Sequence, residues 1–178
     1  MKTKTNNTVL SADEAELERR FIEVIEREEK TISSICFSYA CSVAEYEDLR
    51  QDALINIWRG LAQFREHSSL KTWIYRVTLN SCVSTIRKQS RFGKESESLD
   101  KLYNLVGENP EERERIETLH VLVGTLGAED KAIMLMWLDD ASYEDISEVL
   151  GLTKNTVATR LHRIKEKLAK KYCDYECR

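Results

Sequence analysis

Apolar residues recur along most of this chain every three or four positions, which is the spacing of one face of an α-helix. The pattern predicts a first helix that opens at the capping box of Ser11 and Glu14 and breaks near residues 29–30. Further helices are predicted over residues 43–61 and 69–91. No alternating run of apolar and polar residues is bounded by turn signals, so the pattern indicates an all-α fold.

A second group of helices begins at Asn109, which can cap a helix whose first residue is the chain's only proline. This helix is predicted to reach about residue 126, and the next one covers residues 128–138. Residues 89–109 are rich in serine, glycine and acidic residues without a sustained period, which is typical of a linker. The predicted organisation is two small helical domains joined by a flexible acidic linker, with a first domain over 1–92, the linker over 93–112 and a second domain over 113–178.

The last quarter of the chain has the pattern of a helix-turn-helix. Ser142 can cap a short helix, which a glycine ends, and Thr153 can cap a longer one. The apolar face of the longer helix consists of Val157, Leu161, Ile164 and Leu168. Asn155, Thr159 and His162 point away from this face, and their side chains can hydrogen-bond to base edges.

Basic side chains beside these residues can hold phosphates. They are Arg160, Arg163, Lys165 and Lys167. The alternative is an ordinary helical hairpin with a solvated basic face, because short patterns of this kind also arise by chance.

Basic and acidic residues are concentrated in separate segments of the chain, which suits local DNA contacts. The net charge at pH 7 is −4, yet residues 51–92 and 153–178 each carry a net charge of +5. Residues 118–152 carry seven acidic side chains and one basic side chain. Nonspecific DNA affinity scales with the number of phosphates neutralised, so two small basic blocks in an acidic chain predict weak affinity for DNA alone.

Composition places the chain among soluble globular proteins, with 42% hydrophobic and 33% charged residues. No apolar run approaches the ~18 residues of a membrane span, and the N-terminus lacks the apolar core of a signal peptide. We therefore expect a cytoplasmic protein without membrane contact of its own. The five cysteines lack zinc-finger spacing and are expected to be free thiols, although Cys173 and Cys177, at i and i+4, could alternatively share a metal or be oxidised.

The sequence does not predict an enzyme. The three histidines, His67, His120 and His162, lack metal-ligand spacing, and there is no nucleotide-binding glycine loop or recognisable nucleophile arrangement. Asp139 and Asp140 are interpreted as the acidic end of a helix and its turn rather than as a catalytic pair. We therefore expect no catalytic residue, no cofactor and no metal ion.

Two outward stripes in the first domain point to partners. The stripe on the helix over 43–61 consists of Asp48, Gln51, Asp52, Ile55 and Arg59. An isoleucine ringed by charge resembles a small protein-binding patch, although lone exposed apolar residues are common.

The second stripe lies on the next helix and consists of Thr72, Arg76, Asn80 and Arg87. Trp73 lies at the boundary of this stripe, and Phe64 enters the polar loop just upstream. Aromatic rings can stack on unpaired bases while basic side chains hold the backbone. The alternative is that Phe64 and Trp73 are simply core residues.

These blocks together resemble a known family. Residues 45–58, then Phe64, then residues 71–80, followed by the helix-turn-helix, are similar to the bacterial extracytoplasmic-function sigma factors of RNA polymerase. The resemblance implies an alternative sigma factor that binds core RNA polymerase, directs it to specific promoters and assists promoter melting. Promoter DNA is then a second partner, and an anti-sigma factor, which the family commonly has, is a third.

The roles of the family carry over onto matching positions. The residues implied in docking on the clamp helices of the largest polymerase subunit are Asp48, Gln51, Asp52, Ile55 and Arg59. The residues implied in capturing a flipped base and opening the minus-ten element are Phe64, Arg65, His67, Ser68, Lys71, Thr72, Trp73, Arg76, Asn80 and Arg87. The residues implied in reading the minus-thirty-five element are Lys154, Asn155, Thr156, Ala158, Thr159, Arg160, His162 and Arg163.

A stand-alone helix-turn-helix transcriptional regulator is the alternative. It would explain the second domain but would assign no function to the stripe at Asp48 or to the loop at Phe64. Asn155 and Ala158 depart from the residues often found at their positions in the family, so promoter preference cannot be copied from another member.

Overall fold

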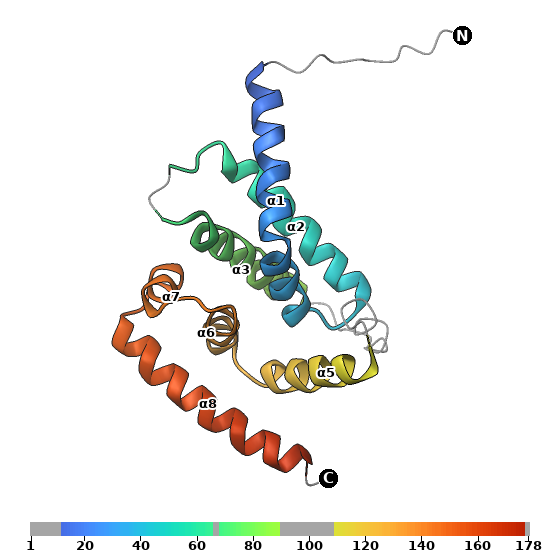
Figure 1. The fold of residues 1–178 in the computed structure, drawn as a ribbon, viewed down its shortest axis with the longest axis vertical. Coiled ribbons are helices and arrows are strands. Elements are labelled where there is room, and N and C mark those ends of the chain that lie inside the picture. The colour runs from blue at the N-terminus through green and yellow to red at the C-terminus, as the bar shows by residue number, and fades with distance from the viewer. Residues whose placement is uncertain (1–11, 66–67, 90–108, 177–178) are drawn as a thin grey trace, which may run out of the picture.

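The structure, a computed structural model, describes residues 12–65, 68–89 and 109–176, and these residues form helices and no strand (Figure 1). The helices are α1 (Ala12–Tyr39), α2 (Val43–Leu61), α3 (Leu70–Gln89), α5 (Pro110–Gly124), α6 (Ala128–Leu138), α7 (Tyr143–Leu150) and α8 (Lys154–Glu176). The predicted all-α fold is confirmed. The predicted cap at Ser11 and most of the predicted linker lie outside the described residues.

The first helix, α1, is continuous over 28 residues, so the predicted break near residues 29–30 is wrong. Glutamate and lysine are good helix formers, and neither removes a backbone hydrogen-bond donor. The Glu29 carboxylate accepts hydrogen bonds from Ser33 and from Arg50 of α2, each at 2.9 Å. The charged stretch therefore belongs to an outer helix face that ties α1 to α2.

Capping residues set several helix ends as the sequence predicts. The Asn109 side chain accepts a hydrogen bond from the backbone N–H of Glu112 at 2.9 Å, so α5 begins inside the range predicted for the linker. Ser142 and Asp145 form a capping box at the start of α7. Gly151 ends α7 with a φ of 67°, in the left-handed region that favours glycine.

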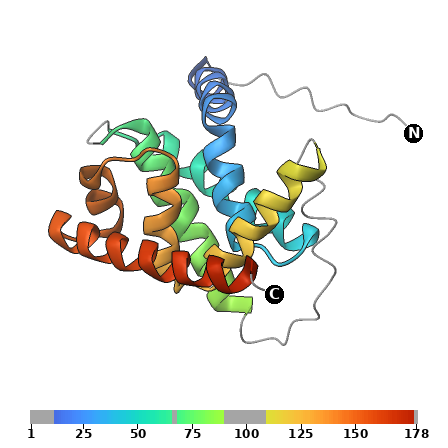
Figure 2. The ribbon, with the colours of Figure 1, turned by 60° about the horizontal axis from the view of Figure 1, so that its bottom comes forward.

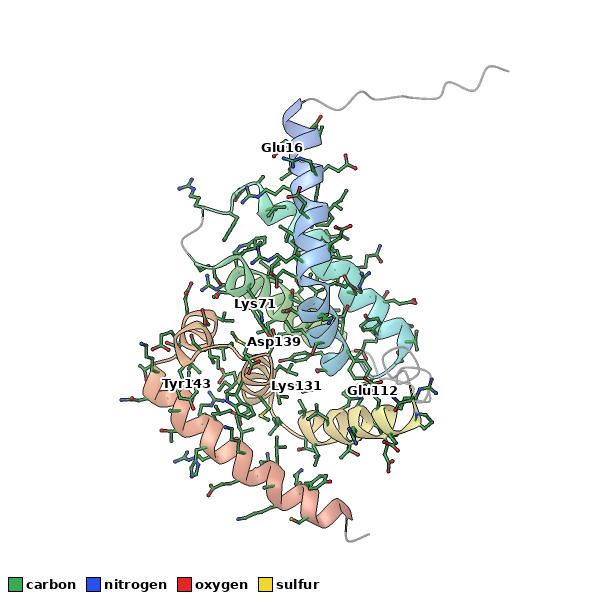
Figure 3. All side chains as sticks on the ribbon, viewed as in Figure 1. Glu16, Lys71, Glu112, Lys131, Asp139 and Tyr143 are labelled. Atoms are coloured by element: carbon green, nitrogen blue, oxygen red, sulfur yellow. The ribbon has the colours of Figure 1, made fainter. Side chains whose placement is uncertain are left out.

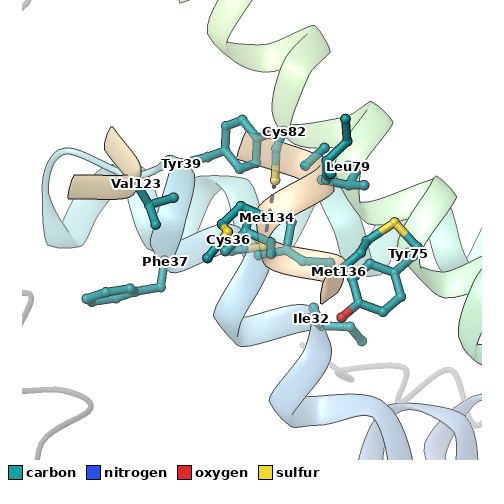
Figure 4. Packing of buried hydrophobic residues seen from close by; sticks show 14 of the residues in the cluster. Ile32, Cys36, Phe37, Tyr39, Tyr75, Leu79, Cys82, Val123, Met134 and Met136 are labelled. Carbon is teal, nitrogen blue, oxygen red and sulfur yellow. Dashed lines mark hydrogen bonds between the residues drawn. The ribbon is translucent and has the colours of Figure 1, made fainter. Parts of the chain in front are cut away.

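One hydrophobic core runs through both halves of the chain. α1, α2 and α3 pack together, α5 lies beside α1, and α6 contacts both α3 and α8 (Figure 2). The core side chains that meet at α6 include Met134, Met136, Ile32, Cys36, Tyr75 and Leu79 (Figure 4). The Tyr39 hydroxyl of α1 donates to the backbone oxygen of Ala128 at 2.9 Å. The two predicted domains are thus packed against each other.

The cysteines of the described residues are free thiols. Cys82 of α3 donates to the sulfur of Cys36 in α1 at 4.0 Å, and both are fully buried (Figure 4). This hydrogen bond and burial raise the pKa of the Cys82 thiol. Cys41 and Cys173 are exposed, whereas Cys177 lies outside the described residues. Among the described helices, no segment combines the length and the hydrophobicity of a membrane span.

Candidate polymerase-binding and DNA-binding surfaces

The outward stripe of α2 is exposed along its whole length. Its members Asp48, Gln51, Asp52, Ile55 and Arg59 are all exposed. The opposite face is fully buried and consists of Leu49, Ala53, Ile57 and Leu61. Ile55 has 39% of its surface accessible, and Asp52 accepts a hydrogen bond from Thr85 of α3 at 2.9 Å. The predicted faces of this helix are confirmed.

An apolar patch that the sequence pattern does not predict adjoins this stripe. Trp58 is 40% exposed, and Ile22 of α1 is 49% exposed. The ring of Phe21 packs edge-on against Trp58 with centroids 5.1 Å apart. Trp58 lies seven residues after Gln51 and three after Ile55, so all three share one side of α2. Exposed rings beside charged residues form the kind of surface that protein interfaces favour.

The aromatic pair Phe64 and Trp73 lies where the chain passes from α2 to α3. The ring centroids are 5.1 Å apart, at an interplanar angle of 38°, and both residues are partly exposed. The Trp73 ring lies against α2, because a Cβ at Gly60 would come within 2.9 Å of its Cζ2 atom. The two rings can therefore pack against the protein and still stack on an unpaired base.

Replacing Gly60 by alanine is expected to displace the Trp73 ring and to bring no gain in thermal stability. A helical glycine-to-alanine change usually stabilises by about 0.5–1 kcal/mol, but here the new Cβ meets the ring. Gly124→Ala is the matched control, since nothing lies within 4 Å of a Cβ there, and should raise the melting temperature by a few degrees. An equal rise for Gly60→Ala in thermal unfolding would contradict the close approach.

The face of α3 that was predicted to contact DNA is partly covered. Thr72 is only 3% exposed, so the prediction that it points to solvent is wrong. The other described residues predicted for this element are Arg65 and Asn80, which are exposed, and Ser68, Lys71 and Arg76, which are partly exposed. The structure does not describe the side chains of His67 and Arg87.

Asp139, directly after α6, forms the centre of this cover (Figure 3). Its carboxylate lies 2.8 Å from the Lys71 ammonium and accepts hydrogen bonds from the hydroxyls of Tyr75 (2.5 Å) and Thr31 (3.2 Å). Burial opposes ionisation, but the bonds from Lys71 and Tyr75 outweigh it and hold the pKa of Asp139 below its usual value. The sequence pattern indicates only a helix end at Asp139, so these contacts with α1 and α3 were not predicted.

Two residues of α7 complete the cover. The Asp145 carboxylate accepts a hydrogen bond from the Thr72 hydroxyl at 3.0 Å. Arg76 donates to the backbone oxygen of Glu148 at 2.9 Å and to its carboxylate at 3.2 Å. We call Asp139, Asp145 and Glu148 the acidic cover.

The helix-turn-helix is formed as predicted. Thr153 caps α8 by accepting a hydrogen bond from the backbone N–H of Thr156 at 3.2 Å. The buried face of α8 consists of Val157, Leu161, Ile164 and Leu168. On its polar side, Lys154, Asn155, Thr159, His162 and Arg163 are exposed, and Thr156 and Ala158 are partly exposed. The predicted faces are confirmed, and the polar face of α8 is open to a ligand.

Two basic side chains of α8 contact α6. The Arg160 guanidinium pairs with Glu129 at 2.7 Å and with Asp130 at 2.6 Å. These hydrogen bonds raise the pKa of Arg160. The Lys165 ammonium lies over the Trp137 ring, 3.5 Å from its centroid. These contacts favour a positioning role for Arg160 and Lys165, and a DNA contact by either residue stays a prediction.

The described residues contain no group of three or more His, Cys, Asp or Glu side chains that could hold a metal ion.

His120 packs against the Phe37 ring with centroids 4.8 Å apart, and burial and the nearby Lys131 lower its pKa. Asp140 has a φ of 58° in the turn after α6. His120 therefore packs inside the fold, and Asp140 lies in the turn between α6 and α7.

Two family models match the chain. The model described as sigma-70 region 2 matches residues 24–92, which include α2, α3 and most of α1. The model described as sigma-70 region 4 matches residues 116–168, which include α6, α7, most of α5 and the first part of α8.

Proteins with similar sequences are named as sigma factors of RNA polymerase. RNA polymerase sigma factor YlaC of Bacillus subtilis is 29% identical over 130 residues, which cover 70% of this chain and 75% of that protein. The extracytoplasmic-function sigma factor SigW of the same organism is 26% identical over 167 residues, which cover 86% of this chain and 89% of that protein.

Solved structures share the fold. The sigma factor RpoE, in complex with the anti-sigma factor NepR from Bartonella quintana, matches with a TM-score of 0.65 and 20% identity over 87% of this chain and 95% of that one. CnrH, in complex with the cytosolic domain of CnrY, matches with a TM-score of 0.67 and 19% identity over 90% of this chain and 94% of that one. Both sigma-70 regions therefore occur here in one fold, and the chain belongs to the extracytoplasmic-function sigma factors of RNA polymerase.

Proposed function

We propose that this chain is an alternative sigma factor that binds core RNA polymerase, directs it to specific promoters and assists promoter melting. The observation that carries the proposal is the presence of both sigma-70 regions in one chain. Phosphoryl transfer then belongs to the polymerase. An anti-sigma factor is a further proposed partner, because the RpoE structure is a complex with one.

The surfaces of the two regions differ in chemistry, and each suits a different partner. The α2 stripe, with Trp58 and Ile22 beside it, offers carboxylate, amide and apolar groups to the polymerase. The pair of Phe64 and Trp73 offers rings to an unstacked base of the minus-ten element. The open polar face of α8 offers side chains to the major groove of the minus-thirty-five element.

Run-off transcription with core polymerase tests the proposal directly. Adding the protein to core polymerase on a library of promoter fragments should produce transcripts with defined start sites. Sequencing these starts should reveal shared elements upstream. If the same start sites appear without the added protein, the assignment is refuted.

A stand-alone helix-turn-helix regulator is the second candidate, because the polar face of α8 is exposed and could read duplex DNA by itself. Such a regulator would bind duplex DNA tightly and specifically without polymerase. A sigma factor with this acidic chain should bind promoter duplex weakly alone and tightly with core polymerase. Gel-shift titrations with and without core polymerase separate the two candidates.

Substitutions on α8 should separate affinity from base preference. Arg163→Ala is expected to lower holoenzyme affinity across promoter sequences and to reduce the salt slope by about 1, because a phosphate contact is lost. Thr159→Ala and His162→Ala should instead change which upstream bases are preferred. Lys170→Ala, an exposed change further along α8, serves as the control. Selection from a promoter library measures both effects, and the reverse pattern would show that the faces are assigned wrongly.

A further inference from the structure

An open cavity of about 530 Å³ lies where the C-terminal half of α1 meets α5 and α6 (Figure 2). Small-molecule sites in proteins are concave, mostly apolar and about 300–1,000 Å³ in volume. Residues of all three helices line the cavity, together with Asp139 directly after α6. None of the lining residues belongs to α2, α3 or α8. The cavity is therefore separate from the stripe of α2 and from the polar face of α8.

Apolar side chains form most of the cavity wall. They are Phe37, Ile116, Leu119, Val123, Leu135 and Leu138. Leu119 is 43% exposed and Leu138 is 42% exposed. Covering such side chains removes apolar surface from water, which favours the binding of an apolar group. The wall on α5 and α6 therefore suits a ligand with an apolar body.

Polar groups of the cavity are gathered on α1. Lys30, Ser34 and Ser38 follow one another at intervals of four residues, so they lie along one side of the helix. The Ser33 hydroxyl donates to the Glu29 carboxylate at 2.9 Å. The hydroxyls of Ser34 and Ser38, in contrast, form no hydrogen bond with another residue that the structure describes. They can therefore donate to a ligand.

The charge of the cavity comes from Lys30. Its side chain is exposed and forms no ion pair within the described part of the chain. Asp139, a member of the acidic cover, also lines the cavity, but its carboxylate lies 2.8 Å from the Lys71 ammonium, which balances its charge. Burial and the nearby Lys131 lower the pKa of His120, so its ring is uncharged at pH 7. One cation beside an apolar wall therefore favours a ligand with a single anionic group.

The size of the cavity favours a small molecule over a partner helix. A helix with its side chains is about 10–12 Å wide, so a length of only about 10 Å already fills about 800–1,100 Å³. This exceeds the volume of the cavity. A helix could insert only some of its side chains, whereas a small molecule can enter as a whole.

We propose that this cavity binds a small amphipathic anion, with its apolar body against α5 and α6 and its anionic group at Lys30 and the two serine hydroxyls of α1. The oxygens of a carboxylate or sulfonate can accept hydrogen bonds from all three groups. The lining residues of α1 fall in sigma-70 region 2, and those of α5 and α6 fall in region 4. The ligand therefore contacts both regions, and its binding to the folded chain raises the melting temperature by mass action.

Two dyes test the anionic group. Anilinonaphthalene sulfonate has an aromatic body and one negative charge, and N-phenylnaphthylamine has the same body without the charge. In fluorescence titrations, Lys30→Gln should weaken binding of the sulfonate about threefold and leave binding of the uncharged dye unchanged. Lys170→Gln, which removes an exposed lysine of α8, is the control and should change neither affinity. An equal effect of the two substitutions, or no effect of Lys30→Gln, would overturn the proposal.

Two substitutions on α5 test the apolar wall. Leu119→Asp removes apolar surface from the cavity, adds a negative charge, and should weaken binding of the sulfonate about tenfold. Val121→Asp adds the same charge at a position of the same helix that is 41% exposed and does not line the cavity. It should leave the affinity within about twofold, and thermal unfolding establishes that both variants are folded. Equal losses in the two variants would contradict the assigned wall.

Displacement of the dye tests ligands of the proposed class. Decanoate carries its carboxylate on a flexible chain and naphthoate carries it on a rigid ring, and decanoate is kept below the concentration at which micelles form. Displacement by either compound supports the proposal and shows whether a chain or a ring fits better. The compound that displaces the dye should raise the melting temperature of the parent protein more than that of Leu119→Asp. If neither compound displaces the dye, or if the parent gains no stability, the cavity is not a site for amphipathic anions.

Discussion

Replacing Asp48 and Gln51 together by alanine is expected to weaken binding to core RNA polymerase about 30-fold, which corresponds to about 2 kcal/mol. Both side chains are exposed on the face of α2 opposite its buried residues. Their truncation removes polar groups from a surface and opens no cavity, so the fold should stay intact. Titration of labelled core polymerase measures the affinity, and thermal unfolding measures the stability.

Glu47→Ala is the matched control for this pair. It removes an exposed carboxylate from the same helix, off the stripe, and should change the affinity less than about twofold. Trp58→Ala tests whether the neighbouring apolar patch belongs to the same interface and should also weaken binding. Unchanged affinity of the Asp48 and Gln51 variant, or an equal loss in the control, would remove the stripe from the interface.

Trp73→Ala is expected to reduce open-complex formation by about 5- to 150-fold while leaving core binding unchanged, because base stacking on an aromatic ring is worth about 1–3 kcal/mol. The ring is partly exposed and packs against Phe64. On a template whose minus-ten region is already unpaired, the cost of strand separation is absent. Run-off transcription from that template should therefore approach the level of the parent protein.

The variant Trp73→Phe separates stacking from packing. It keeps an aromatic ring beside Phe64 and should retain most of the opening activity. The melting temperatures of both variants are compared with that of the parent, since Trp73 also packs against Gly60. If Phe and Ala are equally defective on duplex DNA, or if the unpaired template restores nothing, stacking by Trp73 is refuted.

Helix ends were predictable where the sequence contains residues that cap helices. Ser142, Asp145 and Gly151 define the bounds of α7 through local hydrogen bonds and one left-handed residue, all visible in the sequence. The break predicted near residues 29–30 failed because a run of charges interrupts an apolar pattern without interrupting a helix.

Faces of helices were predictable, whereas contacts between the two halves were not. The buried and exposed sides of α2 and α8 follow from the helical period alone. Thr72 is buried where α7 packs on α3, and there it bonds to Asp145, which lies 73 positions further along the chain. No local pattern encodes how α7 lies on α3, so Tyr75 and Asp139 carried no signal of their shared role.

The attachment of α8 to α6 connects the reading helix to the helix that packs against α3. Arg160 and Lys165 bind α6 residues, so the reading helix moves together with α6. Asn155, Thr159 and His162 face solvent on the opposite side of the reading helix from its buried residues. A change in the packing of α6 on α3 would therefore also move the reading helix.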